Sequence, residues 1–536
     1  MSIKYSDGDV EGEILDILKE AKDISASCDI AYDKYDKWAI KYHLSTIRHN
    51  SIRHLDFSGL DVLEFGAGMG AMSRFVAEKA RHLTVVEGTQ KRFDCLKERL
   101  RDLDNWEGFI ANYQDFHSDR KYDVVCFFGV LEYAGLYIDA PDAFKWAIAH
   151  AKSFLKEDGV LLISIENKNG LKYFSGATED HYAQYFAGIC GYSYLKGIKT
   201  FSRKEMFEML SSFNSVSVQH LLPDYKCTKL VLTDEFVEKH PMVSADIMGE
   251  FESEDYLLPH RRYFPEKLAY MSLAKSGLLG EFSNSYLFIA TNDENSDTST
   301  RLLHKDDGLR AVVYSNGRKN DVATKFIEKD NVVKVRKNYI FKAKEESSLI
   351  QQNFNDEDLI EGDKLSTILF NLAYYNNPKE FLDLFERYIE SCLKKYDSDV
   401  QGELLQSAFD AIPHNCIVKD GEFFNFDYEY KINFPFKKSH FILRNVLYTY
   451  PPINKWALFK DPKDSYLYFC KRFDIEANFE RDMKLEDSVI SAVYKPSLTK
   501  KGFSKKIKHP LMYLAYKLSF GRRRKINKEK YNNIKS

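Results

Sequence analysis

The chain has 536 residues, more than a single hydrophobic core usually supports, so we expect two or three domains. Hydrophobic residues make up 44% of it and charged residues 29%, which is the balance of a globular protein and excludes a disordered one. No apolar run approaches the ~18 residues of a membrane span, and the acidic first residues lack the apolar stretch of a signal peptide. The eight cysteines are scattered singly, which argues against a disulfide framework or a zinc site and fits a reducing cytoplasm.

Residues 60–166 alternate between apolar runs and helical patterns. Strands with near-continuous apolar character, separated by helices, predict a parallel sheet covered on both faces. The expected strands are 60–65, 82–87, 107–112, 122–129 and 159–166.

Later segments extend this organisation. The apolar runs 215–222 and 285–291 are expected as edge strands, and 223–284 between them as an insertion. The polar segment 292–300 is expected to be a linker. Strand-like pieces follow at 310–315, 321–326 and 331–337, and a helical pattern at 377–396.

A glycine-rich segment ends the first expected strand and contains Gly66, Gly68 and Gly70. Glycines let the backbone turn sharply and approach a ligand closely, and the N-terminus of the following helix points at that ligand. The second strand ends at Glu87, where a carboxylate can accept both hydroxyls of a ribose. These features suit NAD as well as S-adenosylmethionine.

Three further features favour S-adenosylmethionine. Glu64 precedes the glycines, a typical methyltransferase feature, and can reach the amino-acid end of the cofactor. Asp115 follows the third strand, where an acid can accept from the adenine amino group. The fourth strand runs into Gly129 and Leu131, not into a second mononucleotide-binding half.

Several segments resemble one family of class I S-adenosylmethionine-dependent methyltransferases, encoded in bacterial gene clusters for O-antigen and other surface polysaccharides. They are YDKWAIKYHLSTIRHN (35–50), VVEGTQKR (85–92), GVLEYAG (129–135), IENKNGLKYFSGATEDH (165–181) and PDYK (223–226). The resemblance implies an α/β, Rossmann-like domain with a mostly parallel seven-stranded sheet over residues 1–295, in which 1–58 is a helical N-terminal segment. It also implies a lipid-linked glycan as the substrate and glycosyltransferases of the same pathway as partners.

The methyl acceptor is expected to be a terminal sugar hydroxyl or a terminal phosphate. A hydroxyl must lose its proton, and the available bases are His43, Glu179, Asp180 and His181. A phosphate is already ionised and needs cations to hold it instead. The candidates for binding the acceptor are Tyr42, Arg48, Lys172, Tyr173, Arg203 and Lys226.

The segment FDAIPHNCIV (409–418) resembles the catalytic loop of protein-kinase-like and aminoglycoside-kinase-like folds. Asp410 would accept the substrate proton, and Asn415 would bind Mg²⁺. Asp427 lies where such folds hold Mg²⁺ against the phosphates of ATP. The resemblance implies a kinase-like α+β domain over residues 301–494.

The remaining parts of an ATP site are less clear in the sequence. Lys334 or Lys337 is the candidate phosphate-binding lysine, Glu345 or Glu346 its partner, and Glu361 lies at the expected hinge. The hairpin 315–321 has one glycine where a phosphate-binding loop has several.

A methyltransferase followed by a kinase resembles the bifunctional chain terminators of O-antigen synthesis, which phosphorylate the end of a lipid-linked glycan and then methylate the phosphate. Two alternatives stay open. One is a catalytically dead kinase-like scaffold that recruits glycosyltransferases, and the other is an NAD-dependent sugar-modifying oxidoreductase. The sequence gives no indication of the oligomeric state.

The last residues, 495–536, are expected to form a basic amphipathic tail. They contain fourteen Lys or Arg residues against one acid, although the whole chain has a net charge of −3. A short apolar patch, 511–520, lies between the basic clusters. Such a segment can lie on an anionic bilayer, so we expect a cytoplasmic protein at the surface of the inner membrane, with no nucleic acid as a partner.

Overall fold

The computed structural model describes residues 8–34, 36–193, 195, 197–258, 262–304, 307–342, 347–449 and 461–495. The expected basic tail lies outside these residues except for Lys495, and so do Glu345 and Glu346. None of the helices in the described ranges is long and apolar enough to span a bilayer.

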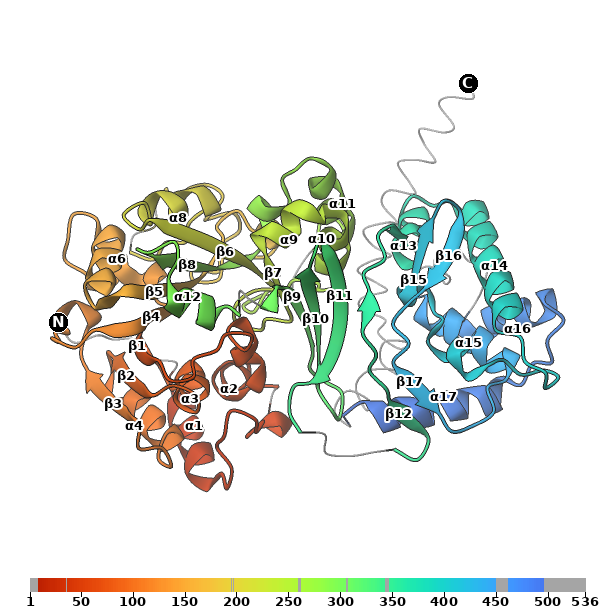
Figure 1. Ribbon diagram of the computed structural model, residues 1–536, viewed down its shortest axis with the longest axis horizontal. Helices are drawn as coiled ribbons and strands as arrows, with labels where there is room; N and C mark the ends of the chain where they lie inside the picture. The colour runs from red at the N-terminus through yellow and green to blue at the C-terminus, as the bar shows by residue number, and fades with distance from the viewer. Residues whose placement is uncertain are drawn as a thin grey trace.

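A parallel sheet forms the first part of the structure (Figure 1). Its strands pair in the order β3-β2-β1-β4-β5, and all four pairings are parallel. The strands are β1 (Asp61–Phe65), β2 (His82–Glu87), β3 (Trp106–Ile110), β4 (Tyr122–Phe128) and β5 (Leu155–Glu166). β1 and β4 are buried along their whole length, as near-continuous apolar runs predict.

Two antiparallel strands continue this sheet. β8 (Ser285–Thr291) lies between β5 and β6 (Ser215–Leu222) and is antiparallel to both. The resulting order, β3-β2-β1-β4-β5-β8-β6, is that of the class I methyltransferase fold, so the predicted α/β class is confirmed. The sheet is larger than the seven strands expected, because the described residues form twelve strands in it. The expectation that β6 and β8 are edge strands is wrong, because β7 (Leu230–Thr233) pairs with β6 and the sheet goes on beyond it.

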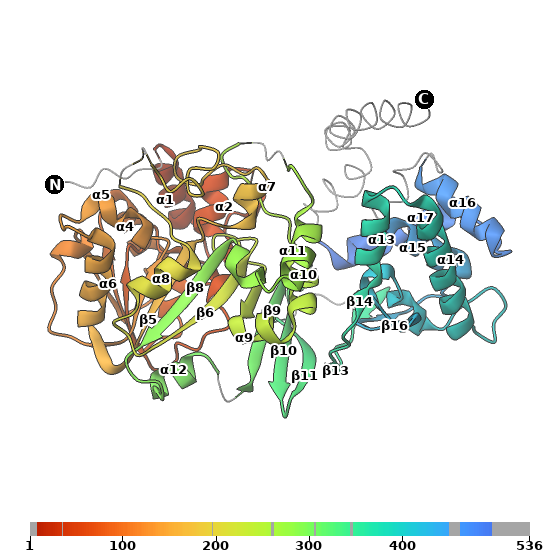
Figure 2. The same ribbon diagram turned by 90° about the horizontal axis from the view of Figure 1, so that it is seen from above.

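Helices cover both faces of the sheet (Figure 2). α3 (Ala71–Ala77) and α4 (Gln90–Arg99) pack on one face, which also buries Val62. α6 (Ala143–Ser153) and α8 (Arg203–Met209) pack on the other. Successive strand residues point to opposite faces, so the neighbouring Val62 and Leu63 belong to different cores.

The N-terminal helices form an additional cover. α1 (Val10–Glu20) packs against α4, and α2 (Trp38–Leu44) joins the same small core. Met69 of the glycine-rich segment is buried in that core as well. The N-terminal segment therefore packs directly on the loop that follows β1.

The sheet continues across the expected boundary between the two domains, which lies between residues 295 and 301. α12 (Asp297–Leu302) begins in the expected linker and continues past its end, and Leu302 of this helix is buried in the core that contains Val62. β9 (Leu309–Ser315) then pairs with β7, and β10 (Val322–Lys329) and β11 (Val332–Tyr339) extend the sheet.

The inserted segment packs on this extension. Its helices are α9 (Asp234–Lys239), α10 (Pro241–Met248) and α11 (Glu266–Lys275). Their apolar residues share one core with Ala311, Phe326 and Val333 of β9 to β11.

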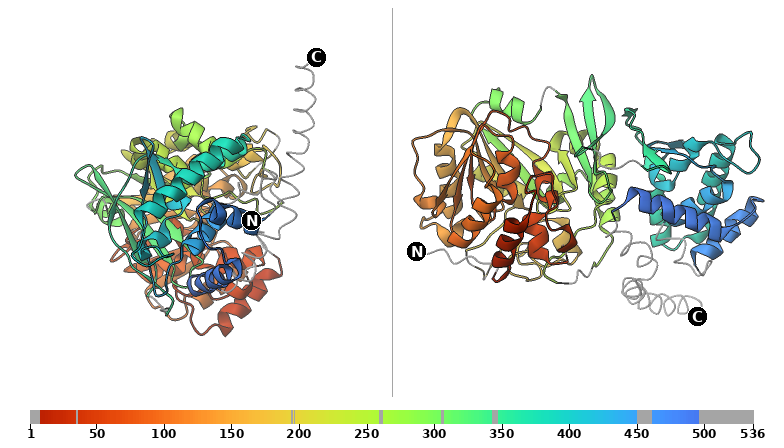
Figure 3. Two further views of the ribbon diagram at one scale, coloured as in Figure 1. Left: turned by 90° about the vertical axis from the view of Figure 1, so that its right-hand side faces the viewer. Right: turned by 90° about the horizontal axis from the view of Figure 1, so that it is seen from below.

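The C-terminal part is a separate α+β unit (Figure 3). Its small sheet pairs β14 (Asp363–Lys364) with β15 (Cys416–Lys419) and β15 with β16 (Glu422–Asn425). Helices surround a core of their own. They are α13 (Leu365–Tyr374), α14 (Pro378–Lys395), α15 (Lys438–Tyr448), α16 (Pro462–Arg472) and α17 (Phe479–Val493).

Candidate functional site

The loop after β1 forms a glycine cradle. Gly66, Gly68 and Gly70 have φ angles of 68°, 57° and 76°, a region that favours glycine. A Cβ atom on Gly66 would lie 2.5 Å from the Val130 side chain, so no larger residue fits there. The chain thus turns sharply between β1 and α3 and leaves its backbone open to a ligand.

Glu87 stands beside this cradle at the end of β2. One carboxylate oxygen accepts from the Gly68 N–H at 2.8 Å, and the other accepts from the Thr89 N–H at 3.0 Å. Asp115 follows β3 in a short 3₁₀ turn and is exposed, while Leu131 is fully buried after β4. The expected cofactor residues therefore line the carboxyl edge of the parallel strands, where ligands of such sheets bind.

Glu64 is the buried acid of the cradle. It is 2% exposed, and its Oε2 atom has no hydrogen-bond partner among the described residues. Burial raises the pKa of Glu64 to about 8. An unpaired buried carboxylate beside open backbone fits the ammonium group of an amino acid, so these residues suit S-adenosylmethionine.

Gly129 follows β4 and lies against the Tyr225 side chain. Its φ angle is 71°, and a Cβ atom there would lie 2.2 Å from the Tyr225 hydroxyl oxygen. Tyr225 comes from the loop between β6 and β7, far along the chain from β4. The loop after β6 is thereby held against the end of β4.

Beyond Gly129 lies a group of buried acids that we call the carboxylate cluster. Its members come from the turn after β4, the end of β5, the loop after α7 (Leu171–Ser175) and the loop after β6. They are Glu132, Glu166, Glu179, Asp180 and Asp224.

Two lysines neutralise one side of the cluster. Lys172 Nζ lies 2.6 Å from Asp180 Oδ2 and 3.8 Å from Asp224 Oδ2. Lys226 contacts Glu166 and lies 3.2 Å from Asp180. Burial alone would raise the pKa of Asp180, but the two lysines hold that pKa well below its ordinary value.

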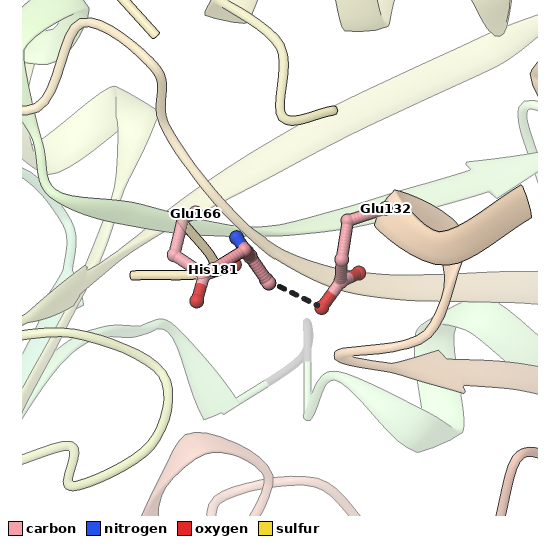
Figure 4. A group of neighbouring side chains, drawn as sticks. All are labelled: Glu132, Glu166 and His181. Atoms are coloured by element: carbon pink, nitrogen blue, oxygen red, sulfur yellow. Dashed lines mark ion pairs between the residues drawn. The ribbon is translucent and has the colours of Figure 1, made fainter. Parts of the chain in front are cut away.

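His181 occupies the other side, between Glu132 and Glu179, and Figure 4 shows it beside Glu132. Its Nδ1 atom lies 2.8 Å from Glu179 Oε1, and its Nε2 atom lies 3.9 Å from Glu132 Oε1. Burial opposes charge on the ring, yet the carboxylates of Glu132 and Glu179 raise the pKa of His181 well above its usual value. The two acids therefore favour the protonated form of the ring.

The other expected acceptor residues divide between the cluster and its surroundings. Tyr173 donates its hydroxyl to Asp180 at 2.9 Å. Arg48 donates to the carbonyls of Tyr225 and Lys226 at 3.2 and 3.1 Å, and its guanidinium lies 4.3 Å from the centre of the Tyr42 ring. Arg48 and Tyr42 thus support the loop after β6 from the N-terminal helices.

Two expected residues take other places. Arg203 pairs with Asp234 and, at 3.1 Å, with Glu281, so the structure does not bring it to the cluster. His43 contacts the Tyr42 ring, and its carbonyl accepts from Arg99 at 2.6 Å. It therefore lies in the N-terminal helical cover.

The sequence alone did not single out three residues of the site, Glu132, Glu166 and Tyr225. A signal existed for Glu166, because it ends β5 as Glu87 ends β2, and strand ends of a parallel sheet face the ligand. Glu132 follows Gly129 by three residues, but only the fold brings it to His181.

In the C-terminal part, the structure separates the two candidate lysines. Lys337, on β11, contacts Asp427 and donates to Glu429 at 2.8 Å. Lys334 pairs with Asp358 on the neighbouring β13 (Glu357–Asp358) and is half exposed. Lys337 is thus the lysine beside the expected metal-binding acid.

The expected catalytic loop is buried. Asp410 Oδ2 accepts from the N–H groups of Glu429 and Tyr430 at 2.9 Å each, and burial raises the pKa of Asp410 to about 7. Asn415 donates to the Asp410 carbonyl at 3.1 Å. Glu361, at the expected hinge, is exposed and pairs with His240 of the insertion.

Comparison with known proteins supports the first half of this description. Residues 36–220 match the family model of a methyltransferase domain. No curated protein sequence matches the chain. The match and the strand order together identify a methyltransferase domain of the S-adenosylmethionine-dependent class I fold.

Solved methyltransferase structures overlap with parts of the chain at low TM-scores, so they add no further argument. A DhpI complex with S-adenosylhomocysteine has 20% identity, with 40% of this chain and 92% of that chain covered, at a TM-score of 0.24. The N-methyltransferase NodS from Bradyrhizobium japonicum WM9 has 13% identity over 46% of this chain and 95% of that chain, at a TM-score of 0.27. A phosphoethanolamine-type N-methyltransferase 2 from Haemonchus contortus has 16% identity over 44% of this chain and 49% of that chain, at a TM-score of 0.26.

The affinity for S-adenosylhomocysteine should rise from about pH 6 to pH 8 and level off above. Glu64 must lose its proton before it can pair with the ammonium group of the cofactor, and its pKa of about 8 sets this range. Glu64→Gln should bind more weakly at pH 8 and lose the pH dependence, as measured by isothermal titration. Glu87→Ala is the control: it should weaken binding roughly tenfold at every pH, because ribose hydroxyls do not titrate. A Glu64→Gln variant with the wild-type pH profile would contradict the assignment.

Proposed function

We propose that the methyltransferase domain transfers a methyl group from S-adenosylmethionine to a neutral sugar hydroxyl of a lipid-linked, O-antigen-type glycan. The observation that carries the choice of acceptor is the carboxylate cluster, in which the lysines are already paired with acids. The glycan itself is proposed from the family resemblance of the sequence.

The cradle residues support the choice of cofactor. S-adenosylmethionine supplies an electrophilic methyl group and leaves as a neutral thioether. Glu64 would hold its ammonium group, and Glu87 its ribose hydroxyls. An NAD-dependent oxidoreductase is disfavoured, because β8 enters between β5 and β6 antiparallel to both and no second mononucleotide-binding half follows β4.

The charge balance of the cluster disfavours a phosphate acceptor. Lys172 and Lys226 are held by Asp180, Asp224 and Glu166, and Arg48 donates to backbone carbonyls. With both lysines paired to acids, a phosphate would meet mainly buried carboxylates, and like charges repel at close range. A sugar hydroxyl, by contrast, can donate to those carboxylates.

The test is to supply labelled S-adenosylmethionine with a lipid-linked glycan that has been treated with phosphatase. Label should appear as a methyl ether that survives acid hydrolysis of the glycan. The matched control is the same glycan carrying a terminal phosphate. Label that enters only the phosphorylated glycan, and is released as methyl phosphate, would overturn the proposal.

We also propose ATP-dependent phosphoryl transfer by the C-terminal part, because Lys337 contacts Asp427 and the Asp410–Asn415 pair lies close by in the chain. Lys337 would hold the phosphates, and Asp427 with Asn415 the Mg²⁺ ion. Asp410 would accept the proton of the substrate hydroxyl, and its pKa of about 7 suits such a base near neutral pH. The phosphate would be a modification separate from the methyl ether.

Asp427→Asn should abolish both Mg²⁺-dependent ATP binding and phosphoryl transfer, because Asp427 would hold the bridging metal. Asp410→Asn keeps an oxygen for the Glu429 and Tyr430 N–H groups, so it should bind ATP and fail only at transfer. Asp358→Asn, which removes the partner of the outward Lys334, is the control that should change neither. If the wild type binds no Mg-ATP at millimolar nucleotide, the C-terminal part is a scaffold that recruits glycosyltransferases.

The basic tail is proposed to hold the protein at the cytoplasmic face of the inner membrane. Deletion of residues 497–536 should release the protein from anionic vesicles and leave methyl transfer to a soluble acceptor intact. High salt should imitate the deletion, because it screens the attraction between basic residues and lipid headgroups. Vesicle binding that survives the deletion, measured by co-sedimentation, would place the membrane contact elsewhere.

A further inference from the structure

Three side chains, two of the carboxylate cluster and that of its neighbour His181, converge on one point. Glu132, Glu166 and His181 each offer one ligand atom, and these atoms lie within 4.8 Å of one another. They come from the turn after β4, the end of β5 and the loop after α7, as Figure 4 shows. Three rigidly anchored segments therefore present two carboxylates and one imidazole to a common space.

The acids at this point have unused oxygens. Glu132 Oε2 and Glu166 Oε2 are buried and have no hydrogen-bond partner among the described residues, and both side chains are 0% exposed. Leaving a buried carboxylate oxygen unsatisfied is costly, so such atoms call for a ligand that the protein atoms alone do not supply.

The orientation of His181 suits metal coordination. Its Nδ1 atom faces Glu179, which also accepts from the N–H groups of His181 and Tyr182 at 2.9 and 2.8 Å. A carboxylate on Nδ1 fixes the ring and directs the Nε2 lone pair outward, as in carboxylate–histidine–metal sites. Nε2 lies 3.9 Å from Glu132 Oε1, too far for a direct hydrogen bond, so a cation can lie between the two atoms.

The charge distribution favours a cation at the same point. The lysines of the cluster reach Asp180, Asp224 and one oxygen of Glu166. Among the described residues, the ion-pair partner of Glu132 is His181, and Lys226 contacts Glu166 through Oε1 and not through the unused Oε2. We propose that Glu132, Glu166 and His181 bind a divalent metal ion.

Two carboxylates and one imidazole form a mixed oxygen and nitrogen set that suits ions such as Mn²⁺ or Zn²⁺. Three protein ligands leave coordination positions open for the acceptor, a role that rests on the function proposed above. A bound sugar hydroxyl would lose its proton to water more easily. Its oxygen would then form a bond to the methyl carbon as the bond from that carbon to the sulfonium sulfur breaks.

The test measures metal binding directly, without an acceptor, on the full chain after treatment with a chelator. Titration with Mn²⁺, followed by electron paramagnetic resonance, should show one site, and Zn²⁺ should compete for it. Glu132→Gln and Glu166→Gln should weaken Mn²⁺ binding by about a hundredfold. Glu179→Gln should weaken it roughly 10–100-fold, because Glu179 only orients His181.

Two control variants locate the site. Asp427→Asn should keep the site, which separates it from the metal expected at the C-terminal part. Glu281→Gln, which changes an acid paired with Arg203 away from the cluster, should also keep it. Binding of S-adenosylhomocysteine by each variant shows that the domain is folded.

The outcomes separate this proposal from the proposed function. One Mn²⁺ site that is lost in Glu132→Gln and kept in Asp427→Asn supports it, even if no sugar is methylated. Absence of Mn²⁺ and Zn²⁺ binding by a wild type that binds S-adenosylhomocysteine would overturn it. Binding that survives Glu132→Gln and Glu166→Gln together would overturn it as well.

Discussion

Burial of several carboxylates in one place is the constraint on which the methyltransferase half depends. An isolated buried charge is strongly unfavourable, so each acid needs a cation or several hydrogen bonds. Lys226 meets this need from the loop after β6, and Lys172 meets it from α7. Because these segments are far apart in the chain, the ion pairs also fix where the loops lie over the strand ends.

The same loop connects the two halves of the protein. Residues 223–229 lead from β6 into β7, and β7 pairs with β9, whose Tyr314 N–H donates to the Lys229 carbonyl at 2.7 Å. Asn50 donates both to the Thr228 carbonyl and to Asn316 in the hairpin after β9, at 2.9 and 2.7 Å. The acceptor side of the methyltransferase is therefore built into the sheet that continues toward the C-terminal part.

Sequence patterns predicted the features that depend on local order. Apolar runs predicted the parallel strands, and Glu64, next to the last residue of β1, and Glu87, the last residue of β2, lie beside the glycine cradle. The positions of β6 and β8 in the sheet were mispredicted, because an apolar strand can have the same sequence pattern at the edge and in the middle of a sheet. The segment 292–300 is polar in composition, yet α12 begins within it and buries Leu302, just beyond its end, in the methyltransferase core. The composition of the segment does not encode this tertiary contact.

On the acceptor side of the site, the type of a residue alone does not predict its role. A lysine in a motif can bind a phosphate or neutralise a neighbouring acid, and only the non-local pairing decides between the two. Lys172 and Lys226 neutralise acids, whereas Arg203 pairs with Asp234 and Glu281 outside the cluster. This divides the site into a neutralised part around Asp180, which holds the loops in place, and a part at Glu132 and Glu166, each of which has one oxygen without a hydrogen-bond partner among the described residues. Chemistry requires groups whose interactions are incomplete in the resting protein, so it belongs to the second part.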